Sequence, residues 1–279
     1  MTPEEVIAYE AEINNWHAKR IDDVIAPNGW INLIGLYWLE PGINSFGSGE
    51  KNSIVFPKGT LPEKAGYFLV KDNTVSLTVE KGVEILSNDS AINNTIIFHP
   101  DSAKNPQLAY GSLRLNIIKR DTKLGIRVRD LESSALKNFK GVERFPINPQ
   151  WKLAARFEKA DSLKTIEVTN VLGQTTAQNS PGAIFFEWEG KEYKLEALEG
   201  KDEFFIVFAD ATTGKETYGG GRFIYVKKPG TDGNTIIDFN KAYNPPCVFS
   251  PYATCPLPPK ENVLPIEIKA GELSYHYDE

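Results

Sequence analysis

The sequence predicts an all-β protein with mainly antiparallel strands and one α-helix at its amino terminus. Short segments in which apolar and polar residues alternate recur along the chain after residue 30. Turns rich in glycine or asparagine separate these segments, and a helical period of apolar residues occurs only at the start. Many short strands joined by turns are typical of antiparallel sandwiches and barrels. We therefore expect one of these architectures, with little helix beyond the amino terminus.

The opening segment has the signals of a helix start. Thr2 can cap free backbone amides, Pro3 suits the first helical position, and Glu5 completes a capping box. Four apolar side chains then recur at three- and four-residue steps, namely Val6, Tyr9, Ile13 and Trp16. We expect the helix to run to about residue 25, where PNG (27–29) stops it, and to pack on a larger body through this stripe.

Two series of candidate strands follow the helix. The first comprises 54–56, 66–70, 75–79, 96–98, 112–119 and 125–130, and the second comprises 152–158, 165–170, 183–188, 193–198, 204–208, 222–226, 235–239 and 266–270. A tight hairpin is expected in the second series, with its turn at Glu189-Gly190. Between the series lies FPINPQW (145–151), which is too short and too apolar for a flexible linker. We therefore expect a helix at 1–26 and two β parts, 27–145 and 146–279, that pack together.

Charge and hydropathy argue against two classes of partner. The chain has 279 residues, with 31 Lys and Arg against 37 Asp and Glu, and a formal net charge of -6. It contains no Lys/Arg-rich tract, so we expect no binding to nucleic acid or to an anionic membrane. No apolar run approaches the ~20 residues that a transmembrane helix needs. The first residues lack the pattern of a signal peptide, so we expect a cytoplasmic protein unless an export signal preceded this sequence.

Histidine is scarce, which limits metal and catalytic chemistry. The three histidines are His17, His99 and His276, and no two have the spacing of metal ligands. The motifs HExxH, CxxC and GxSxG are absent from the sequence. We therefore expect no metal site and no cofactor, and a Ser–His–Asp hydrolase is not favoured.

A glycine run precedes an arginine at the start of an expected strand, in the sequence GGGR (219–222). The run lacks the lysine of a phosphate-binding loop, and a strand rather than a helix follows, so we expect a turn with positive φ angles. The guanidinium of Arg222 could clamp a carboxylate or phosphate, or it could pair with Asp238. A hairpin between the strands at 222–226 and 235–239 would bring these two residues within a few positions of each other. Both roles of Arg222 stay open.

The stretch DFNKAYNPPCVFSPYATCPLPPKEN (238–262), here called the Pro-rich loop, holds six of the eighteen prolines and both cysteines. Its prolines lower the entropic cost of ordering a long loop, and its aromatic residues distinguish it from a disordered tether. We expect an ordered loop at an open end of the second β unit, either as a structural plug or as the edge of a site. Cys247 and Cys255 could form a disulfide or remain two buried thiols. No histidine is close to either in sequence, so we expect neither to be an essential nucleophile.

Several long motifs lie in the second half of the chain: LGIRVRD, FKGVERFPINPQW, FADATTGKETYG, GKETYGGGRFIYV and IIDFNKAYNPPCVFSPYATCPLPPKENVLPIEIKAGE. Together they resemble a family of uncharacterised bacterial proteins, domain of unknown function 1684. The resemblance implies that the family's signature includes Tyr218, Gly221, Arg222, Asp238, Asn240, Tyr243, Asn244, Cys247, Cys255, Pro256 and Asn262. No activity follows from this family.

A shorter stretch, WLEPGINSFGSGEKNSIVFP (38–57), looks like the opening of a forkhead-associated domain, a β-sandwich that recognises phosphothreonine. The resemblance implies such a sandwich for the part at 27–145. Those domains place an arginine after the glycine of the third strand, where this chain has Ser48 after Gly47. They also carry a serine and a histidine in the following loop, where this chain runs PEKAGY (62–67). We therefore expect no phosphothreonine recognition, and micromolar binding of a phosphothreonine peptide would contradict this.

Two classes of function and one structural alternative follow from these patterns. In the favoured class, the protein binds a small polar or anionic ligand, such as a sugar or an organic anion, at the Pro-rich loop. The expected ligand-binding residues are Tyr218, Arg222, Asp238, Asn240, Tyr243 and Asn244. In the second class, the protein is a hydrolase-type enzyme with Asp238 as base and Arg222 as electrostatic clamp. In the structural alternative, the signature residues only stabilise the fold.

Overall fold

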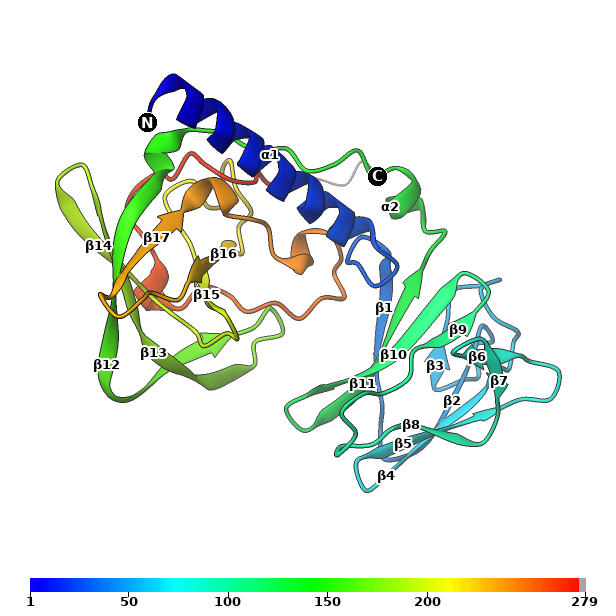
Figure 1. The fold of residues 1–279 in the computed structure, drawn as a ribbon. Coiled ribbons are helices and arrows are strands. Elements are labelled where there is room, and N and C mark those ends of the chain that lie inside the picture. Colours follow the sequence, from blue (N-terminus) through cyan, green and yellow to red (C-terminus); the bar gives the residue numbers. More distant parts are fainter. Residues whose placement is uncertain (276–279) are drawn as a thin grey trace. The chain divides into compact units, whose positions relative to one another are not determined.

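The computed structural model of the protein describes residues 1–275 and divides the chain into two compact units (Figure 1). Ile25–Phe139 form one, here called the inserted unit, and Met1–Val24 with Lys140–Glu279 form the other, the outer unit. The opening helix starts in the same unit as the carboxyl-terminal half, and the division expected at 1–26, 27–145 and 146–279 stays a prediction. Strands far outnumber helices, and nearly all strand pairs are antiparallel, which confirms the all-β prediction. His276 lies outside the described residues.

The inserted unit consists of two sheets and one short helix, α2 (Ser134–Lys137). Its strands are β1 (Leu33–Trp38), β2 (Gly42–Gly47), β3 (Ile54–Val55), β4 (Gly66–Lys71), β5 (Thr74–Val79), β6 (Ile85–Ser87), β7 (Ser90–Ile92), β8 (Thr95–Phe98), β9 (Leu108–Tyr110), β10 (Leu113–Arg120) and β11 (Lys123–Asp130). One sheet has the order β1-β11-β10-β9-β6-β7 and the other β3-β2-β4-β5-β8. Alternate side chains of β5 are buried, as its period-two pattern predicts, and they join Phe46, Phe68 and Ile126 in one core.

Ser48 occupies the position at which a forkhead-associated domain carries its phosphate-binding arginine. The side chain is half-buried, and its hydroxyl donates a hydrogen bond to the carbonyl of Leu61 at 2.7 Å. The hydroxyl thus holds the loop after β2. The likeness of this unit to a forkhead-associated domain stays a prediction, as does the expected lack of phosphothreonine recognition.

The outer unit contains a four-stranded sheet, a two-stranded sheet, helix α1 (Pro3–Ile25), which starts in it, and four short 3-10 turns. The larger sheet has the order β14 (Lys191–Glu196), β13 (Thr175–Trp188), β12 (Lys152–Thr169), β17 (Asn234–Asp238), and the smaller pairs β15 (Glu203–Phe208) with β16 (Arg222–Lys227). The 3-10 turns are η1 (Pro149–Trp151), η2 (Phe239–Lys241), η3 (Pro246–Val248) and η4 (Lys260–Asn262). Phe239 of η2 is fully buried, and its ring meets Trp151, Phe186 and Phe208 edge to face. The start of the Pro-rich loop therefore forms part of the core.

Helix α1 lies along the outer unit beside β17 and η2 (Figure 1). Its predicted capping box is confirmed, since Thr2 Oγ1 accepts from the amide of Glu5 and Glu5 Oε2 accepts from the amide of Thr2. Tyr9, Ile13 and Val24 are buried on one face, as the apolar stripe predicts. No helix among residues 1–275 is both long and apolar enough to cross a membrane.

The two hairpins expected in the second half have opposite outcomes. The turn at Glu189-Gly190 is confirmed, because Trp188 pairs with Lys191 and both turn residues have positive φ. The hairpin expected between β16 and β17 is wrong, because β16 pairs with β15 and β17 pairs with β12. The connection at 228–233 is longer than a two-residue turn, so it does not fix β16 and β17 side by side. Each strand instead pairs where its apolar face is buried, β16 with β15 and β17 with β12.

Candidate functional site

Arg222, the central predicted site residue, lies inside the outer unit with only 1% of its surface exposed. Its guanidinium pairs with Asp210 and donates to the main-chain carbonyls of Ile268 and Ala270. The predicted pairing with Asp238 is wrong, because β16 runs beside β15, whose end leads directly into Asp210. Asp210 in turn accepts from the amide and hydroxyl of Thr212. This ion pair therefore joins three segments of the fold and leaves the guanidinium no open face for a ligand.

Gly221 explains how the chain enters β16. Its φ is +79°, and a Cβ there would lie 2.6 Å from the carbonyl oxygen of Phe208. Only glycine combines this backbone conformation with such a close approach. The expected positive-φ turn before Arg222 is thus confirmed at Gly221.

Asp238, through its Oδ1, and Asn240 also make contacts within the outer unit, while Asp238 Oδ2 is buried without a hydrogen-bond partner among residues 1–275. Asp238 Oδ1 accepts from the hydroxyl of Tyr9 at 2.7 Å and from the amide of Asn240 at 3.1 Å. The amide side chain of Asn240 bonds to both the amide and the carbonyl of Asn148. Burial and the Asp238 carboxylate raise the pKa of Tyr9, so its hydroxyl stays a donor. These contacts attach α1 to the start of the Pro-rich loop.

The remaining predicted residues separate into two places. Tyr218 is half-buried, and burial together with the nearby Cys247 and Cys255 raises its pKa. Tyr243 and Asn244 lie at a second place, beneath α1, where the main-chain carbonyl of Asn244 accepts from Arg20 Nη2 at 2.9 Å. The structure therefore brings Tyr243 and Asn244 together, but not with Tyr218, Arg222 or Asp238.

Around Asn244, five polar side chains from four segments of the sequence meet in what we call the Glu272 cluster. Its members are His17, Arg20, Arg144, Asn244 and Glu272. Glu272 is fully buried, and its Oε2 accepts from the amide of Asn244 at 2.7 Å. Gly271 allows this placement, because its φ of +78° and its lack of a Cβ let the chain approach the carbonyl of Ala242.

The cluster contains buried polar atoms whose hydrogen-bonding capacity is unused. His17 Nε2, Arg20 Nε, Arg144 Nη1, Asn244 Oδ1 and Glu272 Oε1 are all buried without a hydrogen-bond partner among residues 1–275. Glu272 Oε1 lies 3.4 Å from Arg20 Nε and 4.0 Å from His17 Nε2. Native proteins rarely leave such atoms unsatisfied, so several in one place indicate a site for a bound molecule or ordered water.

Electrostatics distinguish the members of the cluster. Burial, and then the guanidiniums of Arg144 and Arg20, lower the pKa of His17 to about 4, so its imidazole is neutral at pH 7. Burial raises the pKa of Glu272, and the nearby Arg20 opposes that rise. Burial lowers the pKa of Arg144, which forms no ion pair with any residue between 1 and 275. Arg144 is thus the cation of the cluster whose charge is not compensated.

Aromatic rings hold Arg20 in place. Its guanidinium carbon lies 4.8 Å from the ring centre of Tyr243 and 5.6 Å from that of Phe249. The Tyr243 ring also packs against Trp16 and Phe223. Such stacking fixes the orientation of a guanidinium before any ligand arrives, which lowers the entropy lost on binding.

Sequence reasoning did not single out four members of the cluster, His17, Arg20, Arg144 and Glu272. One signal was available on α1, because Arg20 continues the apolar stripe at a three- to four-residue spacing and lies three positions after His17. A charged residue on a buried face requires a partner. The partner is more than 200 residues away in sequence, at Glu272, so only the fold could identify it.

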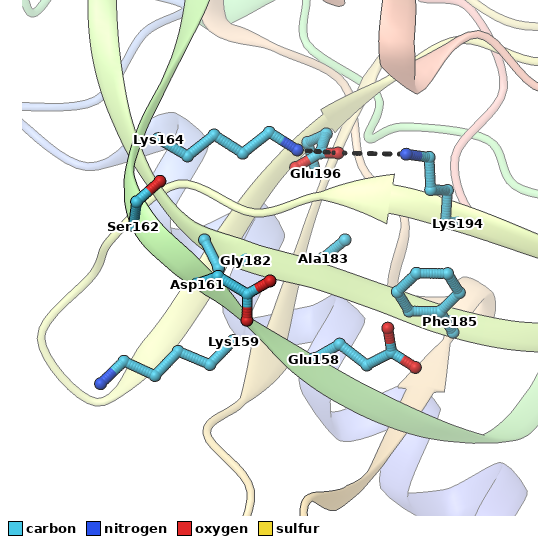
Figure 2. A pocket seen from close by; sticks show the side chains of 11 residues that line it. Glu158, Lys159, Asp161, Ser162, Lys164, Gly182, Ala183, Phe185, Lys194 and Glu196 are labelled. Carbon is cyan, nitrogen blue, oxygen red and sulfur yellow. Dashed lines mark hydrogen bonds and ion pairs between the residues drawn. The ribbon is translucent and has the colours of Figure 1, made fainter.

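A separate cavity lies on the long β12–β13 ribbon (Figure 2) and has a volume of about 490 Å³. It is lined by Glu158, Lys159, Ala160, Asp161, Ser162, Lys164, Gly182, Ala183, Phe185, Lys194 and Glu196. The pairing register of the ribbon shifts between Lys159 and Lys164, which opens the strand at this point. None of the predicted site residues lines this cavity.

The charges of this cavity largely satisfy one another. In Figure 2 the ammonium groups of Lys164 and Lys194 approach the buried carboxylate of Glu196 from opposite sides, whereas Lys159 points away. Lys164 donates to Glu196 at 2.6 Å, and Ser180 Oγ lies 3.3 Å from the second carboxylate oxygen. The Glu272 cluster, which has unused buried donors, is therefore the stronger candidate site.

Comparison with known proteins finds a family model that matches part of the chain. Residues 137–273 match the model of a family described as "Protein of unknown function (DUF1684)". The matched residues include Arg144, Asn244 and Glu272, whereas His17 and Arg20 precede them. No curated protein matches the chain.

Among solved structures, the chain is similar to the solution NMR structure of an uncharacterized protein from Haloarcula marismortui. The two share 27% sequence identity over 49% of this chain and 78% of that one, with a TM-score of 0.41. The family match covers the expected motifs from FKGVERFPINPQW to IKAGE, whereas LGIRVRD (124–130) precedes it. Residues 137–273 thus match the DUF1684 family of proteins of unknown function, as the sequence motifs predict.

Proposed function

We propose that the protein binds a small polar ligand with an anionic group, a carboxylate or a phosphate, at the Glu272 cluster. The observation that carries this proposal is the set of unused hydrogen-bonding atoms at one place beneath α1. Two of them, Arg20 Nε and Arg144 Nη1, belong to guanidiniums, which bind carboxylates and phosphates through directed N–H groups. Asn244 Oδ1 is an unused acceptor, so the ligand also carries a hydroxyl or amine donor, whereas Glu272 Oε1 already faces Arg20 Nε at 3.4 Å.

The charge balance of the cluster supports an anionic group. Two guanidiniums face one carboxylate, and the imidazole of His17 is neutral at pH 7 because its pKa is about 4. Glu272 compensates Arg20 at 3.4 Å, which leaves the charge of Arg144. Arg144 is half-buried and has lost part of its hydration. A bound anion would stabilise its charge in place of that water.

Polar residues elsewhere in the Pro-rich loop support a structural role. Asn262, for example, donates to the carbonyls of Glu196 and Val207 and accepts from the amide of Glu196. Asp238 is held by Tyr9 and Arg222 by Asp210, and these contacts do not favour the base and clamp roles of the hydrolase alternative. Most signature residues thus act as a plug, and only the part around Tyr243 and Asn244 forms the edge of the proposed site.

Isothermal titration of the whole protein with inorganic phosphate, a phosphomonoester and small mono- and dicarboxylates tests the proposal. We expect saturable binding of at least one of these, and Arg144→Gln should weaken it by about tenfold or more, since a hydrogen bond to a charged group contributes about 1.5–3 kcal/mol. Arg20→Gln should act in the same direction. Lys19→Gln, an exposed neighbour on α1, is the matched control and should bind as the unmodified protein does.

A change in the ionisation of His17 provides a second, independent measurement. An anion bound beside the imidazole should raise the pKa of His17 above its value of about 4 in the free protein. Titration of the His17 ring protons by NMR, with and without the ligand, measures this shift. Saturable binding that Arg144→Gln leaves unchanged, with no shift at His17, would place the ligand elsewhere.

A further inference from the structure

The two cysteines of the Pro-rich loop face each other across an eight-residue separation. Each sulfur accepts a hydrogen bond from the other's backbone: Cys247 N donates to Cys255 Sγ at 3.0 Å, and Cys255 N donates to Cys247 Sγ at 3.3 Å. Both cysteines are reduced thiols in this structure. We propose that they form a dithiol site that small-molecule disulfides oxidise reversibly to an intramolecular disulfide.

The two hydrogen bonds limit how far apart the reacting groups can be. Because an N–Cα bond adds about 1.5 Å, Cys255 Sγ lies no more than about 4.5 Å from the Cα of Cys247. By the same reasoning, Cys247 Sγ lies no more than about 4.8 Å from the Cα of Cys255. Since a cysteine's own Cα and Sγ lie about 2.8 Å apart, the first bound limits the two Cα atoms to at most about 7.3 Å from each other. Disulfides join cysteines whose Cα atoms are about 4.4–6.8 Å apart, so a backbone movement of about 0.5 Å at most brings them within this range.

Both cysteines are held by the fold. Cys247 is the middle residue of the 3-10 turn η3, which Pro246 begins. The carbonyl of Cys255 accepts from the amide of Val171 at 3.0 Å, and Leu257 donates to the carbonyl of Thr169 at 2.7 Å. The encounter of the sulfurs is therefore preorganised rather than left to the fluctuations of a free loop.

Exposure and hydrogen bonding assign different roles to the two thiols. Cys247 is partly exposed, whereas Cys255 is 4% exposed, so an external disulfide can reach only Cys247 directly. A backbone N–H directed at each sulfur favours its thiolate form, which is the attacking species in thiol–disulfide exchange. Cys247 is thus the attacking cysteine and Cys255 the resolving one.

The exchange is balanced in two steps. The Cys247 thiolate attacks one sulfur of a disulfide RSSR, forming a mixed disulfide and releasing RS⁻, which takes up a proton. Cys255 then loses its proton and attacks Cys247 Sγ, which forms the intramolecular bond and releases the second RS⁻. Two protein thiols are oxidised, and one RSSR is reduced to two RSH.

The bond would close the segment 247–255 into a ring. Phe249 lies within this ring and packs against Arg20, with 5.6 Å between its ring centre and the guanidinium carbon. Oxidation would therefore fix one wall of the Glu272 cluster. This consequence rests on the proposed function, whereas formation of the disulfide does not.

Oxidation of the native protein by glutathione disulfide tests the inference. After incubation, free thiols are blocked with N-ethylmaleimide and the intact mass is measured, with a urea-denatured sample to confirm that both reduced thiols can be alkylated. We expect loss of two hydrogen atoms, no alkylation, and a crosslinked peptide that contains Cys247 and Cys255. Excess dithiothreitol should restore both thiols.

Single variants test the assigned roles. Cys255→Ser should stop at a mixed disulfide with glutathione on Cys247, whereas Cys247→Ser should react at least about tenfold more slowly because Cys255 is buried. Two alkylatable thiols, found when the protein is denatured in urea and treated with N-ethylmaleimide after equilibration with excess glutathione disulfide, would overturn the inference. So would faster modification of Cys247→Ser than of Cys255→Ser. Neither result depends on whether a ligand binds at the Glu272 cluster.

Discussion

Replacement of Arg222 by Met is expected to lower the free energy of unfolding of the outer unit by about 3–5 kcal/mol. The side chain is 1% exposed, and the variant would leave the Asp210 carboxylate buried without its cation. It would also remove the donors to the carbonyls of Ile268 and Ala270. Urea denaturation followed by tryptophan fluorescence, to which the stacked Trp151 and Trp188 of the outer core contribute, measures the change.

Two further variants show whether the buried charge is the cause. Arg222→Met combined with Asp210→Asn should recover part of the loss, because the second change removes the uncompensated charge. Arg156→Met is the matched control, since Arg156 pairs with Glu158 and Glu192 at the surface. Its denaturation midpoint should equal that of the unmodified protein. A loss for Arg222→Met no larger than about 1 kcal/mol would show that the Asp210 pair does not hold the fold.

Acid is expected to destabilise the outer unit through His17. Burial and the guanidiniums of Arg144 and Arg20 lower the pKa of His17 from 6.5 to about 4. The unfolded chain therefore binds a proton between these values while the folded chain does not. The stability that His17 contributes is fully present above pH 6.5 and is lost as the pH falls through about 4, with a total on the order of 3 kcal/mol.

The measurement is the free energy of unfolding between pH 7.5 and 4 for the unmodified protein and for His17→Gln. The variant should lose this part of the pH dependence, while His99→Gln, whose ring is about half exposed, should retain it. Glu272 acts in the opposite sense, since its raised pKa makes folding more favourable when it is protonated at low pH. Glu272→Gln separates the two contributions. Parallel profiles for His17→Gln and the unmodified protein would contradict the assignment.

Local patterns predicted much of the fold. The spacing of Thr2 and Glu5 predicts the capping box, and the two hydrogen bonds confirm it. Glu189-Gly190 predicts a tight turn, because a two-residue hairpin turn needs positive φ and glycine adopts positive φ readily. The pairing of β13 with β14 confirms it. Each of these features depends on residues that are close in sequence, and their conformational preferences act without help from the rest of the chain.

Pairing between distant segments was not predictable in the same way. The sequence places Arg222 and Asp238 in neighbouring strands, but the structure pairs those strands with β15 and β12 instead. Arg222 pairs with the carboxylate that the strand pairing brings next to it, which is Asp210 after β15. The strand pairing in turn depends on which strand faces are buried. Asp210 is closer in sequence to Arg222 than Asp238 is, yet no local pattern distinguishes the two carboxylates.

The sequence by itself determined the all-β class, the opening helix, the family and the ordered nature of the Pro-rich loop. These follow from periodicity, capping, composition and long motifs. Only the tertiary structure decided that Arg222 is internal and that His17, Arg20, Arg144, Asn244 and Glu272 meet. The reason is physical: burial and electrostatic partnership depend on which surfaces pack together, and Arg20 and Glu272 are more than 200 residues apart in sequence.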